Sequence, residues 1–174
     1  MYIIIFIFIL ILIYIIYQYN HFIDLHKKVE RSKSGIDIYL TQRFDLIPNL
    51  VECVKQYADY EDDIFVTITE ARSKYLQTKN LKDGELVNKQ CNTILLQGEN
   101  YPNLKADEQF IYLQKSLTKM ENQLQAARRI YNIDVTNYNT AISTFPASLI
   151  SSIFHFKEEP FFEPDTNVDV NINL

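Results

Sequence analysis

The first nineteen residues, MYIIIFIFILILIYIIYQY, limit the fold more than any other part of the chain. They carry no charged side chain, and positions 2–17 form an unbroken run of apolar residues and tyrosines. A helix over that run measures about 24 Å, and Met1, Gln18 and Tyr19 extend it toward the roughly 30 Å of a bilayer's hydrocarbon core. Because the run is apolar on every side, a domain this small could not enclose it in protein. Residues 1–19 are therefore predicted to be a transmembrane anchor in contact with membrane lipid.

A cleaved signal peptide is the alternative interpretation of this run. No Lys or Arg precedes it, and no small-residue cleavage site follows it. Tyr14, Tyr17 and Tyr19 suit the interface where aromatic rings meet headgroups. An uncleaved, single-pass anchor is therefore favoured.

The distribution of basic residues predicts the orientation of the anchor. Four of them follow the apolar run closely: Lys27, Lys28, Arg31 and Lys33. The other side of the run carries only the amino terminus. The positive-inside rule then places the rest of the chain in the cytoplasm, with the N-terminus outside.

Helices are predicted for the remainder. Three glycines and five prolines in 174 residues are few for a sandwich or barrel. Apolar residues recur at steps of three or four over 22–57, a pattern typical of one long helix face. Further helices are expected over 61–77, 85–97 and 107–144, with 78–84 as a loop. The fold class is thus all-α, an N-terminal transmembrane helix followed by an antiparallel up-and-down bundle of about four helices.

Pro48 lies inside the first of these helices, where a proline normally costs roughly 3 kcal/mol. Asp45 is expected to cap a restarted helix that has Pro48 in its first turn, where the missing N–H has no partner to lose. The long first helix is therefore predicted to bend near Pro48.

The helix over 107–144 is predicted from Asp107 as its N-cap and a strict heptad seam. Asp134 breaks the seam, and Val135 is the alternative at that place. Pro146 follows the end and opens a short helix. The full seam is Phe110, Leu113, Leu117, Met120, Leu124, Ala127, Tyr131, Asp134, Tyr138, Ile142 and Phe145.

Three regions result: the anchor at 1–19, the bundle at 20–157 and an acidic, poorly ordered tail at 158–174. Phe161 and Phe162 stand among acids in the tail, as in a short linear docking motif. The acidic cluster at 59–63 is explained by the positive end of a helix dipole.

Composition argues against several functions. A net charge of -5 gives no basic field for nucleic acid. Cys53 and Cys91 lack CxxC spacing and are expected to be reduced core thiols. Three scattered histidines form no HExxH pattern, and no phosphate-loop or nucleophile-elbow motif is present. The protein is therefore predicted to be no enzyme and to use no metal or cofactor.

Polar residues beside the seam are the remaining candidates. Glu121, Arg128, Asn132 and Asn139 recur at intervals of seven or eleven, which places them next to the apolar face. Hydrogen bonds between helices that fix the register of the bundle are preferred over a ligand site. Their expected partners are Arg43, Glu70 and Arg72, and Asn49 and Tyr131 are kept with them as candidate structural or interaction residues.

Six stretches resemble the LemA family: RFDLIPNLVECVKQYA, TEARS, YPNLKADEQF, ENQLQAARRIYN, VTNYNTAISTFPASLISSIFHFK and PFFE. The resemblance extends from the apolar N-terminus to Glu163. It implies a bacterial protein of the inner membrane with an antiparallel helical bundle and no established reaction. It also implies an accessory part in envelope maintenance, since members are often encoded near membrane metallopeptidases. Cys53, Ile68, Ile133 and the short, isoleucine-rich anchor depart from the family pattern.

Three functional hypotheses remain open. The first is a membrane-anchored scaffold or adaptor that presents a helix face or the acidic tail to a membrane protein. The second is a self-assembling protein whose heptad helices pair between copies. The third is a ligand or lipid sensor with a pocket inside the bundle.

Overall fold

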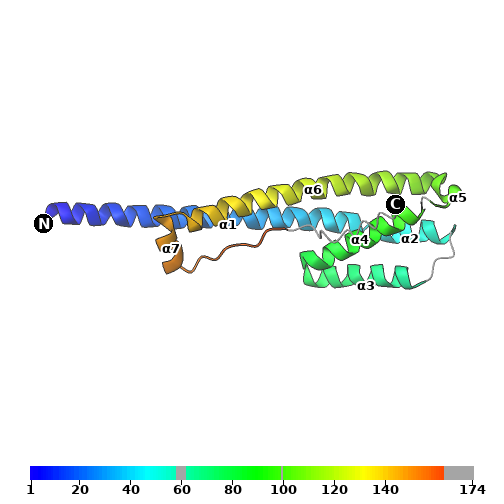
Figure 1. Ribbon diagram of the computed structural model, residues 1–174, viewed down its shortest axis with the longest axis horizontal. Helices are drawn as coiled ribbons and strands as arrows, with labels where there is room; N and C mark the ends of the chain where they lie inside the picture. Colours follow the sequence, from blue (N-terminus) through cyan, green and yellow to red (C-terminus); the bar gives the residue numbers. More distant parts are fainter. Residues whose placement is uncertain (58–61, 99, 163–174) are drawn as a thin grey trace, which may run out of the picture. The chain divides into compact units, whose positions relative to one another are not determined.

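The computed structural model describes residues 1–57, 62–98 and 100–162. Seven helices and no strand are found among these residues, so the predicted all-α class is confirmed (Figure 1). In chain order the helices are α1 (Tyr2–Phe44), α2 (Ile47–Lys55), α3 (Asp62–Thr78), α4 (Leu81–Gly98), α5 (Pro102–Lys105), α6 (Glu108–Ser143) and α7 (Ala147–Ile153).

The apolar run forms the first part of α1. In the part of the chain that the structure describes, this is the one helix long and apolar enough to cross a membrane, and none of its most apolar stretch is buried. The helix continues without interruption for 43 residues. The polar residues after Tyr19 therefore extend the same helix that carries the apolar run.

The chain divides into two compact units. The terminal unit consists of Met1–Lys33 with the residues from Arg128 onward, and the central unit is Ser34–Ala127. Both α1 and α6 contribute to both units, because each division falls within one of these helices.

In the central unit, the chain interrupts its helix at Asp45 and Leu46 and resumes it as α2, with Pro48 in the first turn as predicted. The predicted cap is wrong, because Leu46 occupies the N-cap position and makes no side-chain cap. Leu46 keeps helical angles, φ -84° and ψ -15°, instead of the extended angles that a capping residue needs. Asp45 accepts a hydrogen bond from Arg72 at 3.1 Å.

The connection between α3 and α4 is shorter than predicted. Only Lys79 and Asn80 separate the two helices, and Lys79 has φ 52°. The sequence predicts Gly84 in the loop, but it lies inside α4, where a Cβ would stand 2.9 Å from Leu40 and 3.0 Å from Tyr75. Gly84 thus marks a close approach between α4 and its neighbours. The acidic cluster at 59–63 lies outside the residues whose side chains are described.

Helix α6 begins where the sequence predicts. Asp107 accepts a hydrogen bond from the Phe110 N–H at 2.9 Å and so caps the helix. Val135 takes the seam position in place of Asp134, and it is fully buried. The seam ends before Phe145, which is 77% exposed because the helix stops at Ser143.

In the terminal unit, α7 follows Pro146 and packs Ala147 and Ile150 inward. The chain then runs back along α6 as an extended segment over residues 157–162, which we call the strap (Figure 1). The sequence predicts a poorly ordered tail from residue 158, whereas the structure holds residues 158–162 in place. Residues 163–174 lie outside the described part of the chain.

Candidate functional site

Two asparagine side chains of α6 hold the backbone of the strap. Asn132 donates from Nδ2 to the carbonyl of Phe162 at 3.0 Å, and its Oδ1 accepts from the N–H of Phe162 at 2.8 Å. Asn139 forms the same pair of bonds with Glu159, both at 2.9 Å. Each amide therefore satisfies both polar groups of one backbone residue.

The spacing of the two asparagines matches the geometry of the strap. Seven residues of helix separate Asn132 from Asn139, which is a rise of about 10.5 Å. Three residues of extended chain separate Glu159 from Phe162 and span about 10 Å. An extended segment running antiparallel to α6 can therefore meet both amides without distortion.

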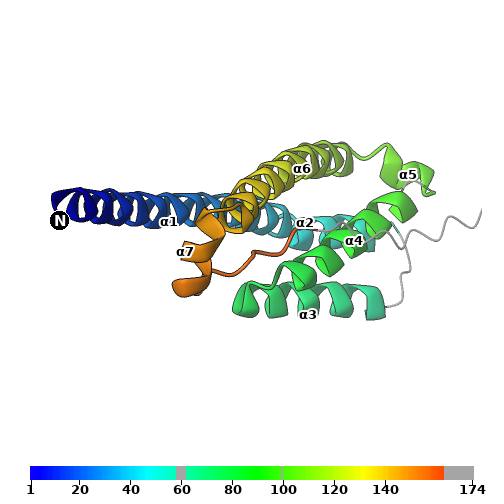
Figure 2. The same cartoon turned by 60° about the vertical axis from the view of Figure 1, so that its left-hand side comes forward.

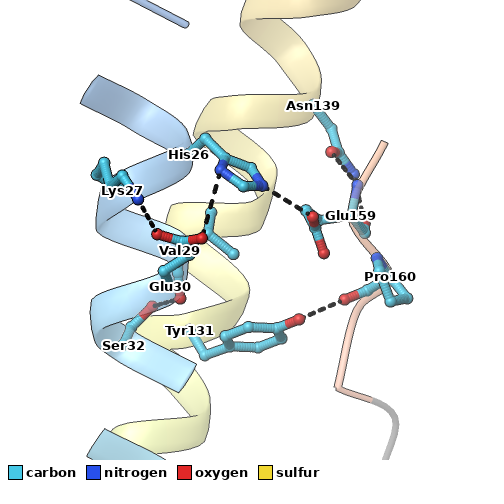
Figure 3. Close-up of polar contacts among 9 residues, drawn as sticks. All are labelled: His26, Lys27, Val29, Glu30, Ser32, Tyr131, Asn139, Glu159 and Pro160. Carbon is cyan, nitrogen blue, oxygen red and sulfur yellow. Dashed lines mark hydrogen bonds and ion pairs between the residues drawn. The ribbon is translucent and has the colours of Figure 1, made fainter. Parts of the chain in front are cut away.

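Side chains add to this backbone recognition (Figure 3). Tyr131 donates its hydroxyl to the Pro160 carbonyl at 2.9 Å. The Glu159 carboxylate lies 3.1 Å from Nε2 of His26 on α1. Because His26 and Tyr131 come from different helices, the strap is attached to α1 as well as to α6 within the terminal unit.

The aromatic residues of the strap face opposite ways. Phe162 is 8% exposed and lies under the guanidinium of Arg128, 4.8 Å from its ring centroid. Phe161 is 51% exposed. The two phenylalanines that the sequence predicts as one docking motif thus differ, since Phe162 is buried against Arg128 of α6 and Phe161 is exposed.

The negative charge of Glu159 affects the neighbouring phenols. Burial raises the pKa of Tyr131 and of Tyr138, and the Glu159 charge raises both further. The ring of His26 packs against Tyr138 with centroids 5.3 Å apart. Both phenols therefore stay protonated and uncharged at neutral pH, and Tyr131 keeps the proton that it donates to the strap.

This arrangement binds a peptide backbone. Amide pairs of this kind recognise backbone N–H and C=O groups, so they hold an extended segment with little regard to its side chains, and the buried Phe162 supplies selectivity at one position. In this structure the bound peptide is the chain's own strap.

The central unit contains a second polar cluster. Arg43 of α1 is 1% exposed and donates to Glu121 of α6 and to Asn92 of α4. Asn88 also donates to Glu121, at 3.1 Å. The structure therefore brings together Arg43 and Glu121, which the sequence predicts as partners. Helix α4 adds two amides that the sequence did not predict, those of Asn88 and Asn92. A buried guanidinium requires such partners to offset the loss of hydration.

The other predicted residues lie apart from these two clusters. Arg72 pairs with Asp45 and not with the polar residues of α6. Pro48 and Arg72 belong to the lining of a hollow of about 370 Å³ between α2 and α3. Asn49 and Glu70 are exposed.

The cysteines and the possible metal ligands form no site of their own among the described side chains. Cys53 and Cys91 are both free and buried. The side chains that the structure describes contain no group of three His, Cys, Asp or Glu able to hold a metal ion.

Sequence reasoning missed His26 and Glu159 as partners. The signal that was available is the seven-residue spacing of Asn132 and Asn139, which equals the length of three extended residues. The sequence instead predicts partners on neighbouring helices, because a bundle seldom offers a free strand.

Similar proteins cover most of the chain. The magnetosome protein MamQ of Magnetospirillum gryphiswaldense is 19% identical over 85% of this chain and 65% of its own length. MamQ 2 of Paramagnetospirillum magneticum is likewise 19% identical, over 86% and 66%. Protein LemA of Metamycoplasma hominis is 23% identical over 68% of this chain and 56% of its own. The chain thus spans about two thirds, or less, of the length of these curated relatives.

A family model gives the assignment. The LemA family model matches residues 32–173, which contain the buried Arg43, the capping Asp107 and both asparagines that hold the strap. The match covers well over half of the chain and begins after the apolar run. The chain therefore belongs to the LemA family.

Proposed function

We propose that this protein is a single-pass, membrane-anchored helical scaffold or adaptor without a reaction of its own. The observation that carries the proposal is the apolar first part of α1, whose most apolar stretch has no buried residue and which continues into a helix shared by both units. An exposed apolar surface of this size is expected to be covered by lipid. The helix would then hold the rest of the chain beside the membrane.

The polar clusters support a structural role. Arg43 and Glu121 are engaged in bonds between helices, and the asparagines of α6 are engaged with the strap. These contacts fix the register of elements, which is what a scaffold requires.

The proposed location is a bacterial inner membrane, with the part after residue 19 in the cytoplasm. Lys27, Lys28, Arg31 and Lys33 are all exposed on α1 just beyond the apolar run. The partner in view is another membrane protein, and the family resemblance makes a membrane metallopeptidase the first class to examine.

Crosslinking in living cells tests the proposal. A photo-reactive phenylalanine analogue at Asn49 or Arg129, both exposed, would be activated by light and its adducts identified by mass spectrometry. The same analogue at Tyr112, 67% exposed on α6, is the matched control. A partner captured from position 49 or 129 but not from 112 is the expected result. Identical adducts from all three positions would contradict a specific adaptor.

Self-assembly is the second candidate, because α6 exposes Ile130 and Ile133, at 55% and 59%, beside its buried seam. Pairing of two copies along this face would cover both side chains. The same crosslinking decides between the two functions, since adducts formed only between copies from Arg129 would favour self-assembly.

Membrane attachment itself needs a separate test. Lysines in place of Ile9 and Ile13 would put two charges into the apolar run, each costing about 2.5–3.5 kcal/mol at a bilayer centre. The wild-type chain should stay in the membrane pellet after alkaline carbonate extraction, and the double variant should be released. Release of the wild-type chain would contradict the anchor.

A further inference from the structure

Helix α7 exposes large apolar side chains although its inner face is already packed. Leu149 is 59% exposed and Ile153 is 71% exposed, and they lie one turn apart on the same side. Phe145, just before the helix, and Phe154, just after it, are also exposed. A surface of this kind is unfavourable in water and indicates a contact that the isolated chain does not supply.

Aromatic contacts place this surface beside the end of the apolar run. Tyr19 of α1 packs against Phe154 and Phe156, with ring centroids 5.0 Å and 5.6 Å apart. Phe156 also packs against Phe22, at 5.2 Å. Figures 1 and 2 both show α7 beside α1. Tyr19 closes the predicted anchor, so the C-terminal end of α7 lies at the level of the membrane interface.

The start of α7 lies at the same level. His26 packs against Tyr138, which aligns α1 with α6 in the terminal unit. Helix α6 ends at Ser143, five residues after Tyr138, and His21 lies five residues before His26, a rise of about 7.5 Å on each antiparallel helix. The end of α6 therefore lies at the level of His21, close to Tyr19 on α1, and α7 begins shortly after it at Ala147.

Charge around α7 also suits a lipid surface. Residues 135–157 contain no Asp or Glu. Their basic residues are His155 and Lys157, and both are exposed. The acids begin at Glu158, whose carboxylate accepts a hydrogen bond from Ser143 at the end of α6. An apolar face with basic residues beside it is typical of helices that lie in the headgroup region of an anionic membrane.

We propose that α7 is an interfacial helix, with Phe145, Leu149, Ile153 and Phe154 inserted into the boundary between headgroups and acyl chains. This rests on the proposed membrane anchoring through α1 and adds a second membrane contact. The occupant of the exposed face is the lipid bilayer, because the face lies where the apolar run would leave the membrane. The terminal unit would then be held against the bilayer instead of rotating about a single helix.

Spin labels on the full chain test this inference. Single cysteines would be introduced as Leu149→Cys or Ile153→Cys, with Cys53 and Cys91 replaced by Ala, and labelled in vesicles of phosphatidylethanolamine and phosphatidylglycerol. Both positions are exposed, so labelling should leave the fold intact, as circular dichroism would verify. Collision with oxygen reports on lipid, and collision with a nickel chelate reports on water.

Two further positions serve as controls. Ile9→Cys reports on the anchor, and Tyr112→Cys reports on water. Labels at 149 and 153 should show an oxygen-to-nickel ratio severalfold above that at 112.

The outcomes separate the two proposals. Labels 149 and 153 with the ratio found at 112, while label 9 lies in lipid, would overturn the interfacial helix and leave the anchor standing. Label 9 in water would overturn the anchor as well. Dipolar broadening between labels at 149 would show that a second copy covers the face, which would also overturn the lipid contact.

Discussion

Arg43 carries a full charge at a position with 1% exposure, and its partners decide whether that charge is tolerated. Glu121 and Asn92 accept its hydrogen bonds from two other helices. A buried ion pair adds little stability compared with apolar residues of the same size, but removal of one partner is costly because the other is left without its counter-charge. We therefore expect the pair to specify the register of the helices more than it adds to stability.

Replacement of Arg43 by Met is expected to destabilise the central unit by about 3 kcal/mol, because Glu121 loses its cationic partner. Urea unfolding of the full chain in detergent, followed by circular dichroism, measures this. Arg43→Met combined with Glu121→Leu should be more stable than Arg43→Met alone, with a coupling energy of about 1–3 kcal/mol. Strict additivity of the two single variants would show that the pair is not coupled.

The thiol of Cys53 predicts a loss of stability at alkaline pH. Burial, followed by the negative charge of Asp107, raises the pKa of Cys53 from 9.0 to about 11. The unfolded thiol loses its proton near pH 9 while the folded thiol keeps its own. The stabilisation is therefore complete below pH 9 and falls as the pH rises toward 11.

Between these values Cys53 should lower the free energy of unfolding by at most about 1.4 kcal/mol per pH unit. Cys53→Ala should flatten this dependence in urea unfolding from pH 8 to 11. Val54→Ala removes a neighbouring buried side chain that does not titrate, so it should lower stability equally at every pH. An unchanged slope in Cys53→Ala would contradict the raised pKa.

At the scale of elements, helices with strong local signals were predictable. Asp107 predicted the start of α6, and heptad spacing predicted its buried face, with Val135 as the alternative to Asp134 in the seam. Pro48 likewise marked the first turn of α2. In each case the cause lies within a few residues of its effect, so the sequence alone contains it.

Elements that depend on distant partners were not predictable. Asp45 looked like a cap, but Leu46 stays helical and Arg72 of α3 attracts the Asp45 carboxylate instead. The strap resembles a disordered tail by composition. Its hydrogen bonds come from Asn132 and Asn139, which precede their partners in the strap by 30 and 20 residues. No local pattern in 157–162 records those partners.

The asparagine contacts make the strap sensitive to single changes. Asn132→Ala removes two hydrogen bonds to Phe162, worth roughly 1 kcal/mol each, so exchange of the Phe162 amide should become about thirtyfold faster. Hydrogen exchange of the full chain in detergent measures this. Asn139→Asp should loosen Glu159, because a carboxylate oxygen would face the Glu159 carbonyl that now accepts a hydrogen bond from the Asn139 amide.

Asn137 provides the control for these variants, since it is exposed on α6 between the two asparagines. Asn137→Ala should leave exchange at Glu159 and Phe162 unchanged. Equal acceleration in Asn137→Ala and Asn132→Ala would mean that the helix, and not the amide pair, protects the strap.

At the scale of the whole chain, charge is ordered along the sequence. The apolar run has no charged side chain, the basic residues gather just after it, and the stretch before Glu158 is free of acids from Val135 onward. Since α1 and α7 meet at Tyr19, the basic residues and the acid-free stretch belong to the same terminal unit. This arrangement places positive charge beside the exit of the anchor, where the positive-inside rule acts.

Topology can therefore be predicted and reversed. With Cys53 and Cys91 replaced by Ala, a single cysteine at the exposed Asn49 should resist a membrane-impermeant maleimide in intact spheroplasts and react after lysis. A cysteine at Tyr2 should react in intact spheroplasts. A charge-exchange variant removes the basic excess: it carries Ile3→Lys and Ile4→Lys, and it has Gln in place of Lys27, Lys28, Arg31 and Lys33. In this variant, position 49 should become accessible to the reagent in part of the population. Reaction at position 49 with the native charges in place would mean that the bundle lies outside the cytoplasm. An unchanged reactivity pattern after the charges are exchanged would show that folding of the bundle, and not charge, sets the orientation.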